Sequence, residues 1–226
     1  MTAEATLRMD RMYRYQRHIY DVSRKFYLLG RDRLVRELEV PPRARVCEIG
    51  CGTGRNLVAL ARRYPDAEIF GIDASNEMLK TANAMIARAG FGARIRTERC
   101  LAEELDPSTT FGLSEPFDAI LFSYTLSMIP DWSRAVDRAV AVLRPAGLLA
   151  VVDFSGQREL PRWFRDLLRR WLALFEVTPR AGLADHLRAL AERERGSLSL
   201  EPLYRDYACL MRYRRPAAAS RGISGA

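Results

Sequence analysis

Glu48-Ile49-Gly50-Cys51-Gly52-Thr53-Gly54 is the stretch that decides the fold of this 226-residue chain. It follows the short apolar segment 44–47, so a strand runs into an acidic residue and then into a glycine-rich turn. Glycine adopts positive φ angles and has no side chain to obstruct an approaching ligand. A helix expected over about residues 54–63 directs its free N–H groups into the same space. The stretch therefore predicts a pocket for a nucleotide-type ligand.

The spacing of the glycines separates this turn from that of a dinucleotide-binding enzyme. The dinucleotide fingerprint is G-x-G-x-x-G, and here Arg55 occupies the place of its third glycine. Glu48 is not part of that fingerprint, and it is placed to accept a hydrogen bond from a ligand ammonium or to orient the loop. The pattern E-x-G-x-G-x-G resembles motif I of the class I S-adenosylmethionine-dependent methyltransferases. The alternatives, a Rossmann dehydrogenase or another nucleotide-binding module, are disfavoured by this spacing.

The downstream elements follow in the order of that class. Asp73 ends the second expected strand, where a carboxylate can accept hydrogen bonds from both ribose hydroxyls of an adenosine, and Ser75 is placed to cap the next helix. Segment 106–115 is expected to be a loop, and segment 143–149 closes a helix and opens the fifth strand. Strands are expected near 44–49, 68–73, 94–99, 117–123, 147–154, 196–204 and 207–214, and helices near 54–64, 75–89, 131–143 and 182–194.

This alternation predicts an α/β fold, namely a Rossmann-like, seven-stranded, mostly parallel sheet with helices on both faces, plus an N-terminal helical lid. Apolar residues at 4-3-4-3 spacing along residues 11–29 predict the lid helix. We assign residues 1–40 to the lid and a basic arm, residues 41–214 to the methyltransferase domain and residues 215–226 to a flexible tail. Within the domain, residues 157–195 are expected to form a helical insertion that contacts a membrane surface.

The composition excludes several classes of protein. No stretch reaches the roughly 20 apolar residues of a membrane span, and the N-terminus has no apolar core of a secretory signal. The four cysteines show neither a C-x-x-C pair nor zinc spacing, so we expect a reduced cytoplasmic protein without a metal. Nucleic-acid methylation is disfavoured, because Ser123-Tyr124-Thr125-Leu126 stands where base-flipping enzymes carry an N/D-P-P-Y-type motif, and no nucleic-acid module is present.

The net charge of +8 lies on the two ends of the chain. Residues 1–45 hold eleven basic and six acidic residues, residues 46–156 hold eleven and fourteen, and residues 204–226 hold five and one. This distribution favours an anionic partner surface. Residues 159–176 combine an apolar face containing Trp and Phe with four arginines off that face, as in a helix lying in a lipid headgroup layer. The alternative is an ordinary helix that covers the core.

Four segments together resemble the bacterial diacylglyceryl-homoserine N-methyltransferases of betaine lipid synthesis. They are residues 15–21 (YQRHIYD), 28–32 (LLGRD), 52–57 (GTGRNL) and 122–132 (FSYTLSMIPDW). The resemblance implies three successive methylations of a lipid amino group at an anionic membrane surface, in a protein that is peripheral at the inner face of the membrane. Other acceptors remain open, namely phosphatidylethanolamine, a quinone or a small amine, as does a non-catalytic cofactor-binding or membrane-surface protein. The oligomeric state is also open.

The resemblance implies S-adenosyl-L-methionine as the cofactor and a set of site residues. Members of the class usually carry an aspartate near position 101 for the adenine amino group, and Leu101 cannot replace it, so we expect backbone groups near Ala102 to serve instead. Arg31 is a candidate partner for a carboxylate, Tyr20 for a place near the reacting centre and His18 for accepting a proton. The catalytic candidates are Tyr20, Arg31, His18 and Ser127. The cofactor-binding candidates are Tyr20, Arg31, Glu48, Gly50, Cys51, Gly52, Asn56, Asp73, Ala74, Met78, Ala102, Ser123 and Tyr124.

Overall fold

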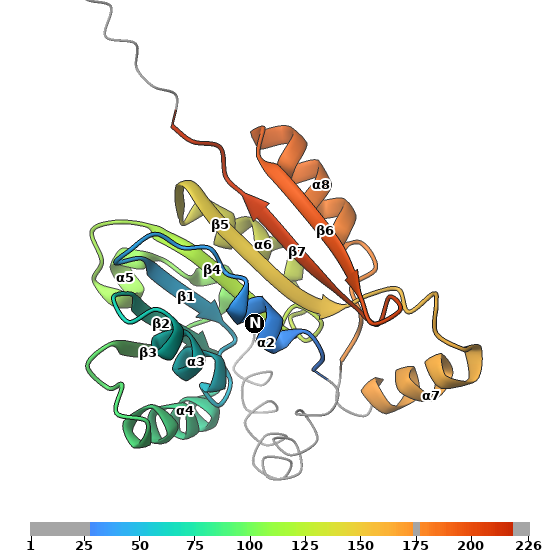
Figure 1. Cartoon of the computed structure of the whole chain (residues 1–226), viewed down its shortest axis with the longest axis horizontal. Helices are drawn as coiled ribbons and strands as arrows, with labels where there is room; N and C mark the ends of the chain where they lie inside the picture. The colour runs from blue at the N-terminus through green and yellow to red at the C-terminus, as the bar shows by residue number, and fades with distance from the viewer. Residues whose placement is uncertain (1–27, 174–176, 219–226) are drawn as a thin grey trace, which may run out of the picture.

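The computed structural model describes residues 28–173 and 177–218 (Figure 1). These residues contain a seven-stranded sheet in the order β3-β2-β1-β4-β5-β7-β6. Strands β1 to β5 pair in parallel, and β7 runs antiparallel to both β5 and β6. The predicted fold class is therefore confirmed. The strands are β1 (Arg45–Ile49), β2 (Glu68–Asp73), β3 (Ile95–Arg99), β4 (Phe117–Ser123), β5 (Leu143–Phe154), β6 (Ser197–Leu203) and β7 (Ala208–Arg214).

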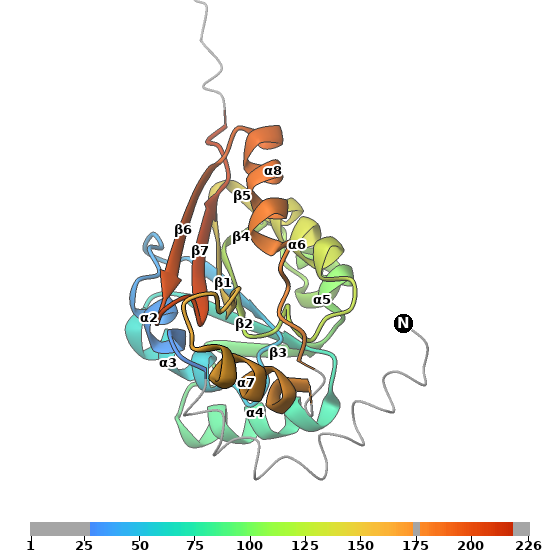
Figure 2. The same cartoon turned by 90° about the vertical axis from the view of Figure 1, so that its right-hand side faces the viewer.

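Helices cover both faces of the sheet (Figure 2). Alternate residues of a strand point to opposite faces, so Val46 of β1 packs with the side of α3 and α4, while Cys47 and Ile49 pack with the side of α6 and α8. Both core layers are apolar, as expected for a parallel sheet buried on both faces. The described helices are α2 (Arg31–Arg36), α3 (Arg55–Arg63), α4 (Asn76–Arg88), the 3₁₀ helix η1 (Ala102–Glu104), α5 (Pro107–Phe111), α6 (Trp132–Ala141), α7 (Arg162–Ala173) and α8 (Leu183–Glu194).

Two sequence predictions of local structure are wrong. Segment 106–115, expected to be a loop, contains α5, because Asp106 caps its N-terminus by accepting the N–H groups of Ser108 (3.0 Å) and Thr109 (3.1 Å). Strand β5 begins at residue 143 rather than 147, since its first residue already pairs with Phe117. The register then shifts, and Ala146 has a φ of 61°, so the extra residues form a bulge instead of a helix end.

The sheet places its functional edge at the carboxyl ends of the parallel strands. The strand order reverses between β1 and β4, which pair with each other while their sequence neighbours lie on opposite sides. Ligands of such open sheets bind in the crevice at this switch point. Residues 1–27, which carry the predicted lid helix, His18 and Tyr20, lie outside the described residues, and the assignment of the lid, domain and tail boundaries stays a prediction.

Candidate functional site

The glycine-rich turn after β1 is fixed in a conformation that requires glycine. Gly50, Gly52 and Gly54 have φ angles of 71°, 54° and 80°. The N–H groups of Gly50 (2.8 Å) and Cys51 (3.0 Å) both donate to the carbonyl of Ile72 in β2. A Cβ atom on Gly50 would lie 2.2 Å from Cγ2 of Thr125. The turn is therefore wedged between β2 and the segment after β4.

Asp73, at the end of β2, ties this turn to the start of α4. Its Oδ2 accepts the N–H of Gly52 (2.8 Å), and its Oδ1 accepts the N–H of Ser75 (2.9 Å). A carboxylate offers about four acceptor sites, and these two bonds use one on each oxygen. Asp73 is half-buried and lines the main cleft. The side chain is thus held in place by the protein while it still faces a ligand.

The main cleft lies along the carboxyl edge and has a volume of about 710 Å³, including its open mouth. This is within the range of roughly 300–1,000 Å³ that is typical of small-molecule sites. Apolar side chains dominate the lining. The lining residues are Ile49, Gly50, Gly52, Asp73, Ala74, Met78, Cys100, Leu101, Ala102, Glu103, Tyr124, Thr125, Met128, Ile129 and Pro130.

A smaller polar pocket of about 330 Å³ shares Gly50 with this cleft. Glu48 is buried there and accepts a hydrogen bond from Nδ2 of Asn56 at 2.7 Å. Nε of Arg31 and Oγ of Ser123 are buried and have no hydrogen-bond partner among the described residues. The pocket thus brings together a guanidinium, a carboxylate, an amide and a hydroxyl. Cys51 also lines it, and burial raises the pKa of its thiol well above the ordinary value, so the thiol is neutral.

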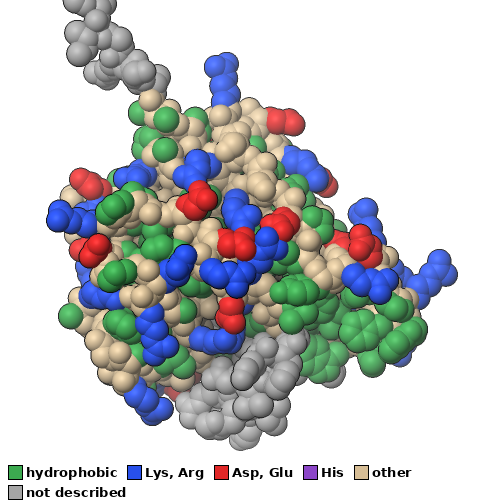
Figure 3. Space-filling view, viewed as in Figure 1, with side chains coloured by type: hydrophobic (Ala, Val, Ile, Leu, Met, Phe, Trp, Pro, Cys, Tyr) green, Lys and Arg blue, Asp and Glu red, His purple; other side chains and the backbone are tan. Residues whose placement is uncertain are grey.

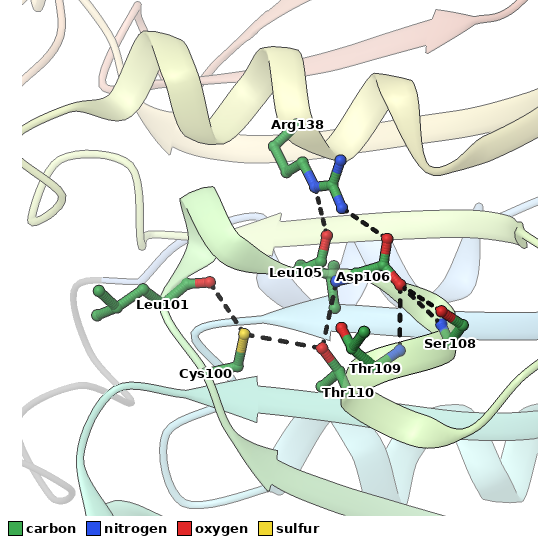
Figure 4. A network of polar contacts seen from close by, with 8 residues as sticks. All are labelled: Cys100, Leu101, Leu105, Asp106, Ser108, Thr109, Thr110 and Arg138. Carbon is green, nitrogen blue, oxygen red and sulfur yellow. Dashed lines mark hydrogen bonds and ion pairs between the residues drawn. The ribbon is translucent and has the colours of Figure 1, made fainter.

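One wall of the main cleft is the segment after β3, which Arg138 of α6 holds from behind (Figure 4). The Arg138 guanidinium donates from Nε to the carbonyl of Leu105 and from Nη2 to Oδ2 of Asp106 at 2.8 Å. The N–H of Thr109 and the hydroxyl of Ser108 are the main causes that lower the pKa of Asp106 to about 2. The anchor therefore keeps its charge at physiological pH, and it fixes the segment that carries Leu101 and Ala102.

Tyr124 and Ser127 belong to the opposite wall but play different parts. Tyr124 has a φ of 56°, and its hydroxyl donates to the carbonyl of Leu29, so it joins the wall to the start of α2. Its pKa is well above the ordinary value because the hydroxyl is buried. Ser127 is fully buried and does not line the cleft, and its N–H points to Asp153 at 3.1 Å. A catalytic role for Ser127 would need contact that this placement does not provide.

The structure thus sorts the predicted site residues into three groups. Residues of the main cleft are Gly50, Gly52, Asp73, Ala74, Met78, Ala102 and Tyr124, and residues of the polar pocket are Arg31, Glu48, Gly50, Cys51, Asn56 and Ser123. Ser127 is in neither, and His18 and Tyr20 lie outside the described residues. Thr125, Met128, Ile129 and Pro130 also line the cleft without having been assigned. The proline-containing turn that follows the fourth predicted strand is the sequence signal that would have included them.

Comparisons with known sequences bear on the central part of the chain. Residues 46–147 match the family described as "Methyltransferase domain". The chain resembles this family over the central segment, and the class I fold that surrounds it is that of S-adenosylmethionine-dependent methyltransferases.

Two curated relatives share this methyltransferase domain. Trans-aconitate 2-methyltransferase of Variovorax paradoxus is 31% identical over 157 residues, which is 70% of this chain and 55% of that protein. The ubiquinone/menaquinone biosynthesis C-methyltransferase UbiE of Geotalea daltonii is 26% identical over 145 residues, covering 62% of this chain and 60% of that protein. The chain therefore spans little more than half the length of these relatives.

Solved structures show the same fold around the methyltransferase domain. The YcgJ protein of Bacillus subtilis superposes with a TM-score of 0.65 and 17% identity, covering 83% of this chain and 98% of that chain. An O-methyltransferase family protein of Burkholderia thailandensis gives a TM-score of 0.68 and 16% identity, covering 88% and 60%. At these identities the likeness establishes the fold.

The residues of the two pockets fit S-adenosylmethionine. Asp73 has the acceptor capacity for a ribose, and apolar groups such as Met78 suit an adenine. The polar pocket offers the Arg31 guanidinium for a carboxylate and the Glu48 carboxylate for an ammonium, which are the two ends of the amino-acid part of the cofactor. The unsatisfied Nε of Arg31 and Oγ of Ser123 need ligand partners in such a buried site. When bound, the cofactor supplies an electrophilic methyl group.

No group of three or more His, Cys, Asp or Glu side chains in residues 28–173 and 177–218 is arranged to hold a metal ion. Among the helices of those same ranges, none has the length and apolar character needed to cross a membrane.

Proposed function

We propose that this protein is an S-adenosylmethionine-dependent methyltransferase whose acceptor is an amphiphile reached at an anionic membrane surface. One observation supports the methyl-transfer part of this proposal. Asp73, the glycine turn and the pocket of Arg31, Glu48 and Asn56 lie together along the carboxyl edge of the sheet. The sheet holds these groups rigidly, so their contribution to catalysis is positioning and the exclusion of water. The burial of Tyr124 and the apolar lining near Met128 support a desolvated reaction site.

Helix α7 supports the membrane part of the proposal. Its Leu168 and Leu172 are buried against the protein, whereas Trp163 is 71% and Leu167 59% exposed. Trp163 also contacts the ring of Phe164 at a centroid distance of 5.7 Å. Figure 3 shows hydrophobic side chains gathered over this part of the molecule with basic side chains at their border. Tryptophan beside arginine on an exposed helix face is typical of a helix that lies in a lipid headgroup layer.

The charge of the α7 region selects the kind of membrane. Residues 158–170 contain five arginines and two acidic residues, Glu159 and Asp166. Arg162, Arg169 and Arg170 are exposed, so lipid phosphates can reach their guanidinium groups. Each basic residue near an anionic surface contributes on the order of 1 kcal/mol to binding. An anionic bilayer therefore fits α7, because its apolar part can take up the exposed apolar side chains and its phosphates can bind the arginines.

Within this proposal two acceptor head groups have specific support. A quinone ring is favoured by the relationship to UbiE, whose name states quinone C-methylation. The amino group of diacylglyceryl-homoserine is favoured by the resemblance of segments 15–21, 28–32, 52–57 and 122–132 to the betaine-lipid methyltransferases. Both acceptors are membrane-borne molecules with a reactive head, which α7 would bring to the edge of the sheet.

The activity is tested with a labelled methyl donor and a panel of acceptors. The purified full chain is incubated with tritiated S-adenosylmethionine and with anionic vesicles that contain a reduced quinone, diacylglyceryl-homoserine or phosphatidylethanolamine, and separately with soluble trans-aconitate. We expect label in one vesicle-borne acceptor and none in trans-aconitate. Calorimetry with S-adenosylhomocysteine on the same protein checks the cofactor site separately. Binding without transfer to any acceptor would contradict catalysis, and labelling of trans-aconitate alone would contradict the membrane-borne acceptor.

The role of α7 gives a prediction about vesicle binding. Arg169→Gln with Arg170→Gln is expected to weaken binding to phosphatidylglycerol vesicles on the order of 10-fold at low salt, with a smaller effect at high salt because salt screens exposed charges. The matched control is Arg188→Gln with Arg193→Gln on α8, which removes the same charge from another exposed helix. Sedimentation with vesicles measures both.

A second substitution separates lipid insertion from simple charge attraction. Trp163→Ala is expected to reduce binding to the same vesicles, whereas Tyr204→Ala, at a turn residue that is 54% exposed, leaves binding unchanged. Equal effects of the two substitutions, or equal effects of the two arginine pairs, would show that α7 is not the membrane-contacting face.

A further inference from the structure

The cleft wall after β4, residues 124–130, is held from behind by a segment distant in sequence. The N–H of Thr178 donates to the carbonyl of Ser127 at 3.0 Å. Arg180 donates from Nε to the carbonyl of Leu126 at 3.1 Å and from Nη2 to the carbonyl of Ile129 at 2.7 Å. Three backbone carbonyls of the wall therefore accept hydrogen bonds from Thr178 and Arg180, which lie between α7 and α8.

Asp153 of β5 completes this support from the sheet. The side chain is 1% exposed, its Oδ2 accepts the N–H of Ser127 at 3.1 Å, and its Oδ1 accepts the N–H of Phe154 at 2.8 Å. Neither Asp153 nor Arg180 lines the cleft. Arg180 binds the carbonyl of Ile129, which does, and Asp153 binds the N–H of Ser127, which lies between the lining residues Thr125 and Met128. We call Asp153, Thr178 and Arg180 the rear clamp.

A buried carboxylate is costly, so its presence needs a reason. An apolar residue at position 153 would leave the N–H of Ser127 without its acceptor, and a buried donor without a partner destabilises the fold. The guanidinium of Arg180 offsets part of this cost, because its positive charge attracts the Asp153 carboxylate. Burial lowers the pKa of Arg180, and the negative charge of Asp153 opposes that change. Both charged side chains thus bind backbone groups of the wall.

We propose that Asp153 and Arg180 are positioning residues that hold the 124–130 wall in the shape needed by the acceptor, and that ionisation of Asp153 loosens this wall. The inference rests on the proposed function, since it assigns the wall to the methyl-transfer site. The positions of the two residues are those of a support: they bind the backbone of Leu126, Ser127 and Ile129, within the segment whose Thr125, Met128, Ile129 and Pro130 line the cleft.

The pH dependence follows from the environment of Asp153. Burial raises its pKa to about 6, against the lowering effect of the N–H groups of Phe154 and Ser127. Arg180 and the hydroxyl of Tyr124 are the other charged or titratable groups whose fields couple to it. Because the folded-state pKa is above the ordinary 3.8, the carboxyl stabilises the fold most below that ordinary value, and this stability is lost as the pH rises through 6. Ionisation at higher pH therefore favours an opened wall, in which water reaches the carboxylate.

Hydrogen exchange of the full chain tests the clamp without knowledge of the acceptor. After correction for the intrinsic pH dependence, we expect amides 126–129 of the wild type to exchange on the order of 10-fold faster at pH 7 than at pH 5, since ionisation of the buried carboxyl favours the opened wall. Asp153→Asn is expected to remove this pH dependence. Arg180→Met is expected to raise exchange of the same amides at both pH values, and Arg180→Lys, which keeps the charge but not the forked geometry, is expected to raise it less.

The matched controls are an arginine and an aspartate that make the same kinds of hydrogen bond to backbone groups outside the 124–130 wall. Arg138→Met removes the other arginine that holds a cleft wall through a carbonyl, and it is expected to expose amides after β3 while sparing 126–129 (Figure 4). Asp118→Asn removes a carboxylate that accepts the N–H of Arg45 at 2.6 Å, at the opposite edge of the sheet, and should also spare them. For the acceptor labelled in the panel, the rear-clamp variants are expected to raise KM, with a wild-type pH profile that changes near pH 6 and a flat one for Asp153→Asn.

The outcomes separate this inference from the proposed function. If the wild type does not bind S-adenosylhomocysteine, the proposed function fails whatever the exchange data show. If it binds, but amides 126–129 exchange equally at both pH values in the wild type, the clamp is overturned. This wild-type measurement needs no variant, so it remains decisive even if Asp153→Asn or Arg180→Met fails to fold.

Discussion

Asp73→Ala is expected to lower the affinity for S-adenosylhomocysteine on the order of 100-fold, measured by calorimetry, because two hydrogen bonds of roughly 1–3 kcal/mol each lose their acceptor. The substitution also releases the N–H groups of Gly52 and Ser75, which the two carboxylate oxygens now accept at 2.8 and 2.9 Å. The glycine turn and the start of α4 would thus lose their common tie. Both effects act on the same side of the cleft and in the same direction.

The control for this change is Asp118→Ala. Asp118 also accepts a backbone N–H, that of Arg45 at 2.6 Å, and its side chain is 9% exposed, so its loss costs the fold a comparable interaction at the other edge of the sheet. We expect reduced stability and unchanged ligand affinity for Asp118→Ala. An unchanged affinity for Asp73→Ala, or an equal loss for both variants, would mean that the cofactor does not contact the end of β2.

The sequence was sufficient for the parts of the site that are local along the chain. Glu48, Gly50 and Gly52 lie within five residues, and Asp73 ends the next strand, so a strand–turn–helix pattern places them without any long-range information. The same is true of the sheet, whose buried strands read as apolar runs. The structure also brings Leu101 and Ala102 to the cleft, next to Glu103, and the expectation that backbone groups near Ala102 meet the adenine stays a prediction.

The parts that the sequence did not reveal depend on contacts across long separations. Arg180 reaches Leu126 over 54 residues and Ile129 over 51, and no periodicity in the chain encodes such a pairing. Helix α5 was missed because it has only five residues and owes its start to one capping aspartate. Ser127 was a catalytic candidate within the segment 122–132, but it is fully buried and its N–H donates to Asp153, so it does not line the cleft. A one-residue change in the direction of a turn cannot be read from residue types alone.

Gly50→Ala is expected to abolish measurable binding of S-adenosylhomocysteine and to lower the melting temperature, whereas Gly90→Ala is expected to retain binding. The two glycines share a positive φ, 71° and 78°, so alanine meets a similar backbone strain of roughly 1–2 kcal/mol at both. They differ in surroundings: a Cβ on Gly90 meets nothing within 4 Å, but one on Gly50 lies 2.2 Å from Cγ2 of Thr125.

The collision at Gly50 cannot be relieved by a small shift of the turn. The N–H groups of Gly50 and Cys51 are both bonded to the carbonyl of Ile72, so movement away from Thr125 would break the join between β1 and β2. Overpacking of this kind typically costs a further 1–3 kcal/mol, about 2–4 °C in melting temperature per kcal/mol for a domain of this size. The difference between the two variants in calorimetry and thermal unfolding therefore isolates the steric contact from the strain. Equal behaviour of Gly50→Ala and Gly90→Ala would show that the turn has room for a side chain, and the close approach of cofactor and backbone inferred from its glycines would have no structural basis.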